Sequence, residues 1–349
     1  MVPAHLATLT KVRATMSGSV GNWVLAALAV LIIGFALGPR VVTGGPAFFL
    51  QILTYGFSDG AVYALVAIGY TMVYGIIELI NFAHGDVFTL GAAVSIPLLG
   101  AFGLAEGNTL NFLSVLALLA VFAITMALIG VLNMAIERIA YRPLRSAPRL
   151  APLITAVGVS FILEGIMALW IGNSTVHYPD ILPNTRYSLG GGATLGFKDI
   201  FVVVVGVILV TALTLFIGRT KLGTAMRATA QDREAAQLMG IDINRTIAAT
   251  FFIGAALAGA GGIIFGLYYN SINFQLGFSA GLFAFTAAVL GGIGNIQGAA
   301  LGGLIIGLMR AFSDGYLASE WTDVWIFAML ILVLVFRPTG LLGMHVPEK

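Results

Sequence analysis

The stretch of this chain that decides its fold reads Asn81-Phe82-Ala83-His84-Gly85-Asp86. It is a polar turn with a long apolar segment on each side, residues 48–76 and 86–102. Each segment is long enough to cross a bilayer, which takes about 20 mostly apolar residues. A polar turn between two such segments favours a membrane transporter.

The composition also places the chain in lipid. Of its 349 residues, 59% are hydrophobic and only 9% are charged, and the mean hydropathy is +1.00. Soluble domains carry about 25% charged residues. A net charge of +2, with basic residues scattered between apolar runs, does not indicate a nucleic-acid surface. The absence of Cys and the four scattered His argue against a metal centre, so we expect a protein without metal, cofactor or catalytic site.

Ten segments are apolar enough to be membrane spans and predict an all-α, polytopic helix bundle. They cover residues 22–38, 48–76, 86–102, 112–136, 150–171, 201–217, 247–268, 280–294, 296–311 and 324–336. With a cytoplasmic N-terminus, thirteen Lys and Arg residues fall inside and four fall on or near the outside. This positive-inside bias predicts that both termini are cytoplasmic. The longest external connector, residues 172–199, is expected to be an ordered surface loop.

Glycine spacing indicates close contact between helices. Several glycines within the apolar segments are four residues apart, which puts small residues on one helix face and lets two backbones approach. These pairs are Gly56/Gly60, Gly262/Gly266, Gly298/Gly302 and Gly303/Gly307. We interpret them as packing positions.

Residues 80–85 and 272–277 share four of six positions. Five expected spans separate them, so the two copies lie on opposite sides of the membrane. This is the arrangement of an inverted five-plus-five repeat. Four matches in a chain rich in Gly and Phe also arise by coincidence, so the repeat and the coincidence both stay open.

The connector after the sixth span is too polar to cross the membrane. Residues 224–239 are rich in helix formers, Gly240 suits a left-handed C-terminal cap, and Asn244 can cap the next helix. In one continuous surface helix, Arg227, Gln231 and Glu234 share a face. The plain alternative is a basic loop that only sets the membrane topology.

This connector also resembles a known family. Glu234-Ala235-Ala236, with Gly240 four residues later, is similar to the E-A-A…G loop through which ABC importer permeases dock onto their ATPase subunits. Residues 60–75, 137–149, 153–161 and 337–343 resemble the permease subunits of importers for branched-chain amino acids, which have urea permeases among their relatives. The resemblance implies that the connector meets an ATPase through Arg227, Gln231, Arg233, Glu234, Ala235, Ala236 and Gly240.

The resemblance covers about residues 49–343 and sets the expected organisation. Residues 1–47 are an N-terminal segment with an additional anchor, residues 48–343 are the permease domain, and residues 219–246 are the coupling loop within it. No Gly-Lys pair and hence no P-loop occurs, so ATP hydrolysis is expected on a separate chain. The resemblance implies that the chain lies in the inner membrane. The implied partners are a second related permease, two ATPase subunits and an extracytoplasmic substrate-binding protein.

Polar residues within the spans are candidates for the pathway. Ser58 and Asp59 interrupt the long second span and could cap a half-helix beside a cavity, or simply mark a helix start at the outer surface. Tyr63 and Tyr70 share a helix face and suit packing or pathway lining, and Asn81 and His84 suit a structural turn or a gate.

Glu164 and Arg310 lie at a similar depth, each about 14 residues from the cytoplasmic end of its span. We therefore expect them to pair.

The resemblance implies import of branched-chain or other hydrophobic amino acids, with urea and short amides as an alternative cargo. A self-sufficient secondary transporter or channel is the rival of another class, because ten spans and an inverted repeat would serve it as well. Its usual coupling carboxylates are scarce here, since only Asp59 and Glu164 are clear candidates.

Overall fold

The protein is seen here as a computed structural model that describes residues 21–77, 81–107, 111–145, 147–148 and 150–343, with side chains from residue 44 onward. In these residues the chain is a bundle of helices with four short strands. The helices are α2 (Gly21–Ile77), α3 (Ala83–Ala101), α4 (Phe112–Ile136), α5 (Leu150–Ile171), α6 (Phe197–Arg219), α7 (Lys221–Gln231), α8 (Arg233–Leu238), α9 (Ile243–Tyr269), α10 (Leu276–Gly291), α11 (Ile296–Tyr316) and α12 (Thr322–Phe336). Short π and 3-10 turns are η2 (Glu137–Tyr141), η3 (Arg142–Leu144) and η4 (Ser319–Trp321).

The centre of the bundle is formed by α2, α3 and α9, which pack against one another. Their apolar side chains, such as Leu65, Phe88 and Ile263, are fully buried. The outer helices α4, α5, α6 and α12 instead expose large apolar side chains, among them Phe161 and Leu169. A soluble protein would not leave faces of this kind in water, so the outer helices face lipid.

Seven helical stretches of the described chain are long and apolar enough to cross a membrane. Each of the ten expected segments lies mainly within a helix, and α10, with 16 residues, is shorter than the typical span of about 20. The expectation of an all-α, polytopic membrane bundle is confirmed.

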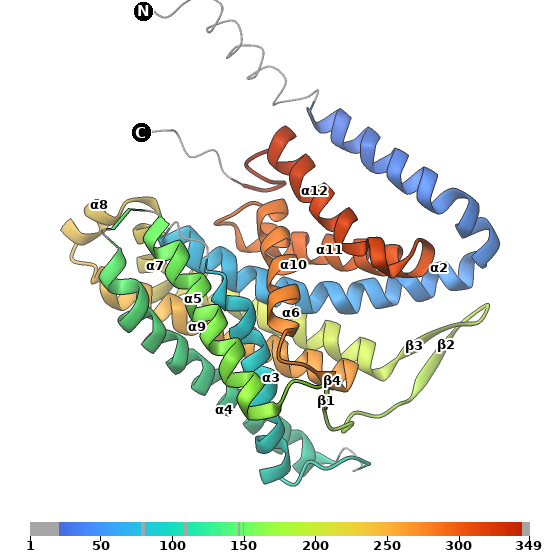
Figure 1. Cartoon of the computed structure of the whole chain (residues 1–349), viewed down its shortest axis with the longest axis horizontal. Coiled ribbons are helices and arrows are strands. Elements are labelled where there is room, and N and C mark those ends of the chain that lie inside the picture. The colour runs from blue at the N-terminus through green and yellow to red at the C-terminus, as the bar shows by residue number, and fades with distance from the viewer. Residues whose placement is uncertain (1–20, 78–80, 108–110, 146, 149, 344–349) are drawn as a thin grey trace, which may run out of the picture.

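The expected break of the second span at Ser58 is wrong. α2 continues without interruption through Ser58, Asp59 and Gly60, and its break lies at Gly45, where φ is +71° and ψ is 170°. Gly tolerates this conformation because it has no Cβ. The chain reverses direction there, so the two limbs of α2 run in opposite directions (Figure 1). Asp59 neither caps a half-helix nor starts a helix.

The Gly-x-x-x-Gly pairs lie at helix contacts, as expected. α11 packs along α2, and a methyl group at Gly307 would lie only 2.1 Å from the backbone nitrogen of Gly60. Gly262 meets the carbonyl oxygen of Phe88 on α3 in the same way, at 2.2 Å. Small residues let these backbones touch, which gives the contact area that van der Waals packing in lipid requires.

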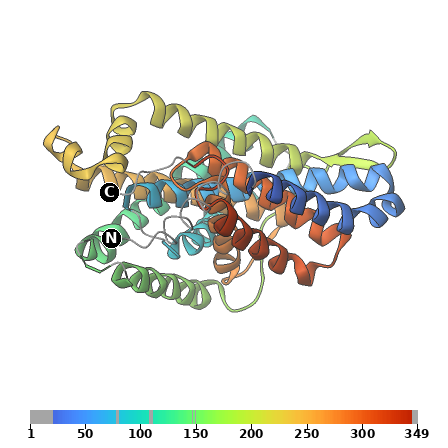
Figure 2. The same ribbon diagram turned by 90° about the horizontal axis from the view of Figure 1, so that it is seen from above.

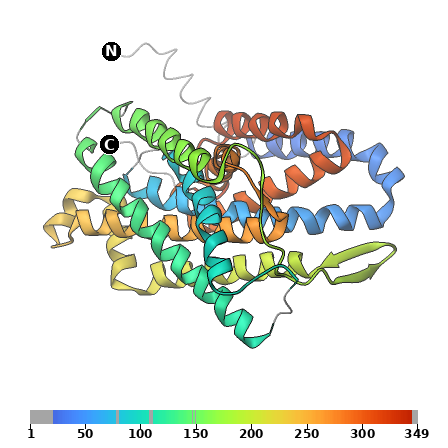
Figure 3. The ribbon, with the colours of Figure 1, turned by 60° about the horizontal axis from the view of Figure 1, so that its bottom comes forward.

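The connector of residues 172–199 is ordered, as expected, and is built from strands. β2 (Arg186–Gly190) and β3 (Ala193–Gly196) form an antiparallel hairpin, while β1 (Val176–His177) pairs with β4 (Ser271–Ile272) after α9. The β2–β3 hairpin lies at one end of the bundle and α8 at the other in every view (Figure 1, Figure 2). α4 crosses α9 obliquely between these two ends (Figure 3). We call the two ends the hairpin end and the α8 end.

Candidate functional site

The connector between α6 and α9 forms two helices, so the expected single helix over residues 224–239 is wrong. Asp232 has an extended backbone, with φ −155° and ψ 111°, and separates α7 from α8. Its carboxylate accepts hydrogen bonds from the backbone nitrogens of Glu234 and Ala235, at 2.9 and 3.0 Å. Asp favours such an N-cap over a helix interior. Arg227, on α7, therefore does not share a helix face with Glu234.

The turn after α8 follows the expectation at one residue and departs from it at another. Gly240 has φ +82°, so the predicted left-handed cap is confirmed. The cap of α9 is Asp242, which accepts from the backbone nitrogen of Arg245 at 3.1 Å, and the expectation for Asn244 is wrong. Asn244 is the second residue of α9 and accepts a 2.9 Å hydrogen bond from Arg145, which also contacts Glu137.

α8 presents most of its residues to the surface. Glu234 and Ala235 are exposed, as are Arg227 and Gln231 on α7, while Ala236 is buried against the bundle. The apolar side chains at the end of α8 project furthest, since Leu238 is 88% and Met239 83% exposed. The tip of this short helix, which Asp232 caps, is thus apolar and exposed.

Arg233 faces inward, unlike its neighbours. Its Nε and Nη2 donate to the carbonyl oxygen of Ile76 at 3.1 and 2.6 Å, which joins α8 to the last turn of α2. Sequence reasoning placed Arg233 among the residues that meet the ATPase and missed this bond, because no local pattern connects two residues that are 157 positions apart.

A cluster of charges joins α2, α9 and α11 near the hairpin end. Arg310 lies 3.7 Å from Asp59 and 3.6 Å from Asp314, and it donates to the hydroxyl of Tyr63. The hydroxyl of Tyr269 donates to Asp59. Asp59 and Tyr63 are buried, so this cluster holds three helices together through paired charges within the membrane.

The expected pair of Glu164 and Arg310 is not among the ion pairs of the described residues. Glu164 lies on α5, one turn beyond Ser160, whose hydroxyl donates to Asp86 on α3. The depth estimate left out which helices are neighbours. α11 packs along α2, whereas α5 packs against α3, so Arg310 meets Asp59 instead.

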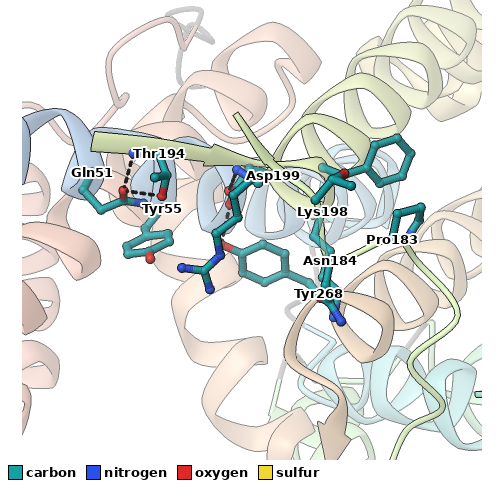
Figure 4. A pocket seen from close by; sticks show the side chains of 12 residues that line it. Gln51, Tyr55, Pro183, Asn184, Thr194, Lys198, Asp199 and Tyr268 are labelled. Atoms are coloured by element: carbon teal, nitrogen blue, oxygen red, sulfur yellow. Dashed lines mark hydrogen bonds between the residues drawn. The ribbon is translucent and has the colours of Figure 1, made fainter. Parts of the chain in front are cut away.

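Ser58 belongs to a second polar group at the hairpin end. Its hydroxyl donates to Asp199 at 3.0 Å, and Asp199 also accepts from the Tyr268 hydroxyl at 2.8 Å and from the Gly196 nitrogen at 2.9 Å. A cavity of about 290 Å³ opens beside this group, lined in part by Tyr55 (Figure 4). Sequence reasoning missed Asp199 and Tyr268, because each looked like the boundary of a span.

Tyr70, Asn81 and His84 lie together and apart from the hairpin-end groups. The ring of His84 packs edge-on against Tyr70, with centroids 4.8 Å apart, and Asn81 accepts a 2.8 Å hydrogen bond from the Tyr141 hydroxyl. All three candidates are buried, in positions that anchor the start of α3. The pathway candidates of the sequence thus lie in separate places, with Ser58, Asp59 and Tyr63 at the hairpin end and Tyr70, Asn81 and His84 around the start of α3.

Comparison with known proteins identifies the family. The family model described as "Branched-chain amino acid transport system / permease component" matches residues 52–334. The chain belongs to this permease family. The permease protein BraD of the high-affinity branched-chain amino acid transport system of Pseudomonas aeruginosa is 45% identical over 307 residues, which cover 86% of this chain and 98% of BraD. No solved structure matches this permease significantly.

Other relatives of this permease are named for related transport systems. LivH of Escherichia coli K12, a permease protein of the high-affinity branched-chain amino acid system, is 43% identical over 306 residues, with 86% of this chain and 98% of LivH covered. LsrC of Enterobacter sp. strain 638, a permease of the autoinducer 2 import system, is 26% identical, with 88% and 83% covered. The chain is thus a permease subunit of an ABC-type importer.

Proposed function

We propose that this chain forms half of the membrane pathway of an ATP-driven importer for branched-chain or other hydrophobic amino acids. The alignment with this chain covers nearly the whole of BraD and of LivH, and the names of these two relatives support this cargo. ATP hydrolysis occurs on separate subunits, since the sequence has no P-loop. The complete importer contains a second related permease, two ATPase subunits and an extracytoplasmic substrate-binding protein.

The coupling proposal rests on one observation, the bond between Arg233 and Ile76 behind the exposed tip of α8. An ATPase that holds Leu238 and Met239 in a groove can push or pull α8 as a rigid piece. Arg233 passes this movement to α2, which lies at the centre of the bundle. Arg227, Gln231, Glu234, Ala235 and Gly240 complete the docking surface, within the coupling loop of residues 219–246.

The helix contacts also support an inverted five-plus-five repeat of ten spans within residues 22–336. α11 packs along α2, and α4 packs along α9. If α2 of the first half corresponds to α9 of the second, and α4 to α11, these two helix pairs are equivalent contacts. The corresponding helices α3 and α10 meet each other near their starts, where a methyl at Gly85 would lie 2.1 Å from the Gly277 carbonyl oxygen. Equivalent residues of an inverted repeat meet at its two-fold axis.

The proposed orientation in the inner membrane places α8 and both termini in the cytoplasm and the β2–β3 hairpin outside. The hairpin, Ser58 and Asp199 then lie where cargo arrives from the binding protein. Residues 48–343 form the permease domain, and residues 1–47 contain an additional anchor. Residues 1–20 lie outside the described residues.

Reconstitution tests this function. The importer, assembled with its partners in lipid vesicles that contain ATP, should accumulate leucine, and urea uptake is measured in parallel. Leu238→Glu should weaken retention of the ATPase subunits and uptake at least about tenfold, because it places a charge in an apolar contact. Leu189→Glu, the same change at the exposed hairpin, should keep the ATPase.

Three results would contradict the proposal. Retention of the ATPase by Leu238→Glu would remove the docking role of α8. Uptake of urea in preference to leucine would show that the alternative cargo, urea or a short amide, is the correct one. Accumulation of solute by vesicles that contain only this chain and an ion gradient would make it a secondary transporter.

A further inference from the structure

The cavity of about 290 Å³ at the hairpin end lies between α2, the β2–β3 hairpin, α6 and α9 (Figure 4). Its size is near the lower limit of small-molecule pockets, which begin at about 300 Å³. The residues of the coupling proposal, on and around α8, are not part of the lining of this cavity. Its lining is therefore free to serve another purpose.

Asp199, in the first turn of α6, supplies a negative charge to this cavity. It is only 6% exposed, and its three hydrogen-bond donors, from Ser58, Tyr268 and Gly196, are all neutral. Among the residues that the structure describes, no Lys or Arg pairs with it. A carboxylate has about four acceptor positions, so one remains for a further donor. A buried carboxylate without a cation is costly, and a cationic ligand would relieve that cost.

Arg186 supplies an unpaired positive charge to the same cavity. It lies on β2 directly opposite Gly196, the residue whose nitrogen donates to Asp199. Its guanidinium is exposed and makes no ion pair or hydrogen bond within the described part of the chain. Lys198 also lines the cavity but is held by Asp180 at 2.9 Å and Asn270 at 2.5 Å. Arg186 is thus the cation left to bind an anionic group.

The remaining walls are partly apolar, since the rings of Tyr55, Phe197 and Tyr268 contribute to the lining. Among the described residues, one small cavity thus combines a cation and a carboxylate that each lack an ion-pair partner with an aromatic surface. A zwitterion with an apolar side chain satisfies all three.

We propose that this cavity is a receiving site for a hydrophobic α-amino acid, with the substrate ammonium at Asp199 and its carboxylate at Arg186. The inference rests on the proposed cargo class and adds a site to it. The exposure of Arg186 makes the site weak, because water and salt screen its charge. A weak site suits a transfer point, from which cargo moves on past Ser58 and Asp59 into the bundle.

The test measures ligand binding to the permease without the high-affinity binding protein. The purified importer with its ATPase subunits, in lipid nanodiscs, is titrated with three probes by saturation-transfer NMR. The probes are L-leucine, L-leucinamide, which lacks the carboxylate, and 4-methylpentanoate, which lacks the ammonium. Leucine should bind at least about tenfold more tightly than either analogue, because each analogue loses one charge-assisted hydrogen bond.

Variants assign each charge to its partner. Arg186→Gln should weaken leucine binding about tenfold and leave leucinamide unchanged, and Arg186→Lys should restore part of the loss. Asp199→Asn should weaken the binding of leucine but not the binding of 4-methylpentanoate. Because Asp199 also joins Ser58 and Tyr268, the Tm of that variant is measured beside its binding. Arg138→Gln, an exposed Arg at the other end of the bundle, is the matched control and should behave like the parent.

Several results would overturn the inference. One is unchanged leucine binding by Arg186→Gln. Another is an Arg186→Gln variant that binds leucine normally but no longer docks the binding protein, which would make the cavity a site for an acidic group of that protein. Uptake of leucine by the complete importer without leucine binding in nanodiscs would reject the cavity and leave the proposed function standing. Absence of both would reject the cargo class as well.

Discussion

Arg233 fastens α8 to the bundle through a single carbonyl group. The Ile76 oxygen lies in the last turn of α2, where carbonyl groups have no partner within the helix and the helix dipole is negative. A guanidinium satisfies both the hydrogen bond and the dipole, and its two donors fix the orientation of α8 as well as its distance.

We expect Arg233→Gln to uncouple the importer without removing the ATPase. The variant loses a charge-assisted contact of about 1–2 kcal/mol, so its Tm should fall by a few degrees. The ATPase subunits should still copurify, because Leu238 and Met239 are unchanged, but cargo-stimulated ATP hydrolysis should drop several-fold. Gln237→Ala, on the exposed side of α8, serves as the control. Stimulation equal to that of the parent would show that Arg233 transmits nothing.

Asp180 stabilises the hairpin end through Lys198 and Asn184. Partial burial by itself raises the pKa of Asp180, but the hydrogen bonds from Lys198 and Asn184 outweigh it and hold this pKa below the usual value of 3.8. A pKa that is lower in the folded state means that the stabilising contribution is complete above the unfolded pKa and is lost as the pH falls through the folded one.

We therefore expect Asp180→Asn to lower the Tm at pH 7, by the equivalent of about 1 kcal/mol. The difference in Tm between parent and variant should shrink as the pH falls below about 4, because the parent then loses its charge too. Thermal unfolding in nanodiscs at pH 7 and at a pH below about 4 measures this difference in Tm. Glu320→Gln, at an exposed carboxylate in η4, controls for general charge effects. An equal difference at both pH values would show that the carboxylate charge is not the cause.

At the scale of the element, α11 and α2 pack with their backbones in close contact. Gly303 and Gly307 of α11 lie on Ala64 and Gly60 of α2, where even one added carbon meets backbone atoms at 2.4 and 2.1 Å. Backbone atoms cannot move aside as flexible side chains do, so the two helices would have to separate. The same contact positions Arg310 against Asp59.

Gly307→Ala should therefore destabilise the permease by about 1–3 kcal/mol through overpacking and lower the yield of folded protein. Gly158→Ala is the matched control, because Gly158 lies within α5 and has open space where the methyl group would lie. The control should be neutral or slightly stabilising, since Ala is the better helix former. The test compares the Tm values of the two variants, measured in the same detergent. Equal Tm values would mean that α11 can shift on α2 without cost.

At the scale of the whole molecule, the hairpin and α8 lie at opposite ends of one bundle (Figure 1). This separation is what a transport subunit needs, because cargo arrives on one side and force on the other. Arg233, α2, Ser58 and Asp199 form a continuous chain of contacts between these ends.

The separation can be tested with single cysteines, because the chain contains none of its own. Leu238→Cys on α8 and Tyr187→Cys on β2 are both exposed and should react with an impermeant maleimide. We expect Tyr187→Cys to react in intact cells and Leu238→Cys only after the membrane is opened. Phe88→Cys, which is fully buried, should react in neither case. Labelling of Tyr187→Cys and Leu238→Cys from the same side would refute the proposed orientation.

The sequence by itself determined the features that depend on neighbouring residues. Hydropathy over about 20 residues gave the helices, Gly240 marked its left-handed cap, and the spacing of Gly303 and Gly307 indicated a helix contact. The E-A-A…G pattern in the sequence likewise indicated the permease family. These signals are local, because they reflect the length of the bilayer, the backbone and the adjacent turn.

Only the tertiary structure decided which distant groups meet. Arg310 pairs with Asp59 and not with Glu164 because α11 packs along α2, and Asp199 binds Ser58 and Tyr268 because three helices converge at the hairpin end. Such partners are set by the shape of helix surfaces in close contact, and many pairings of polar residues are compatible with the same hydropathy pattern. For this reason the sequence predicted polar groups in the membrane but not their partners.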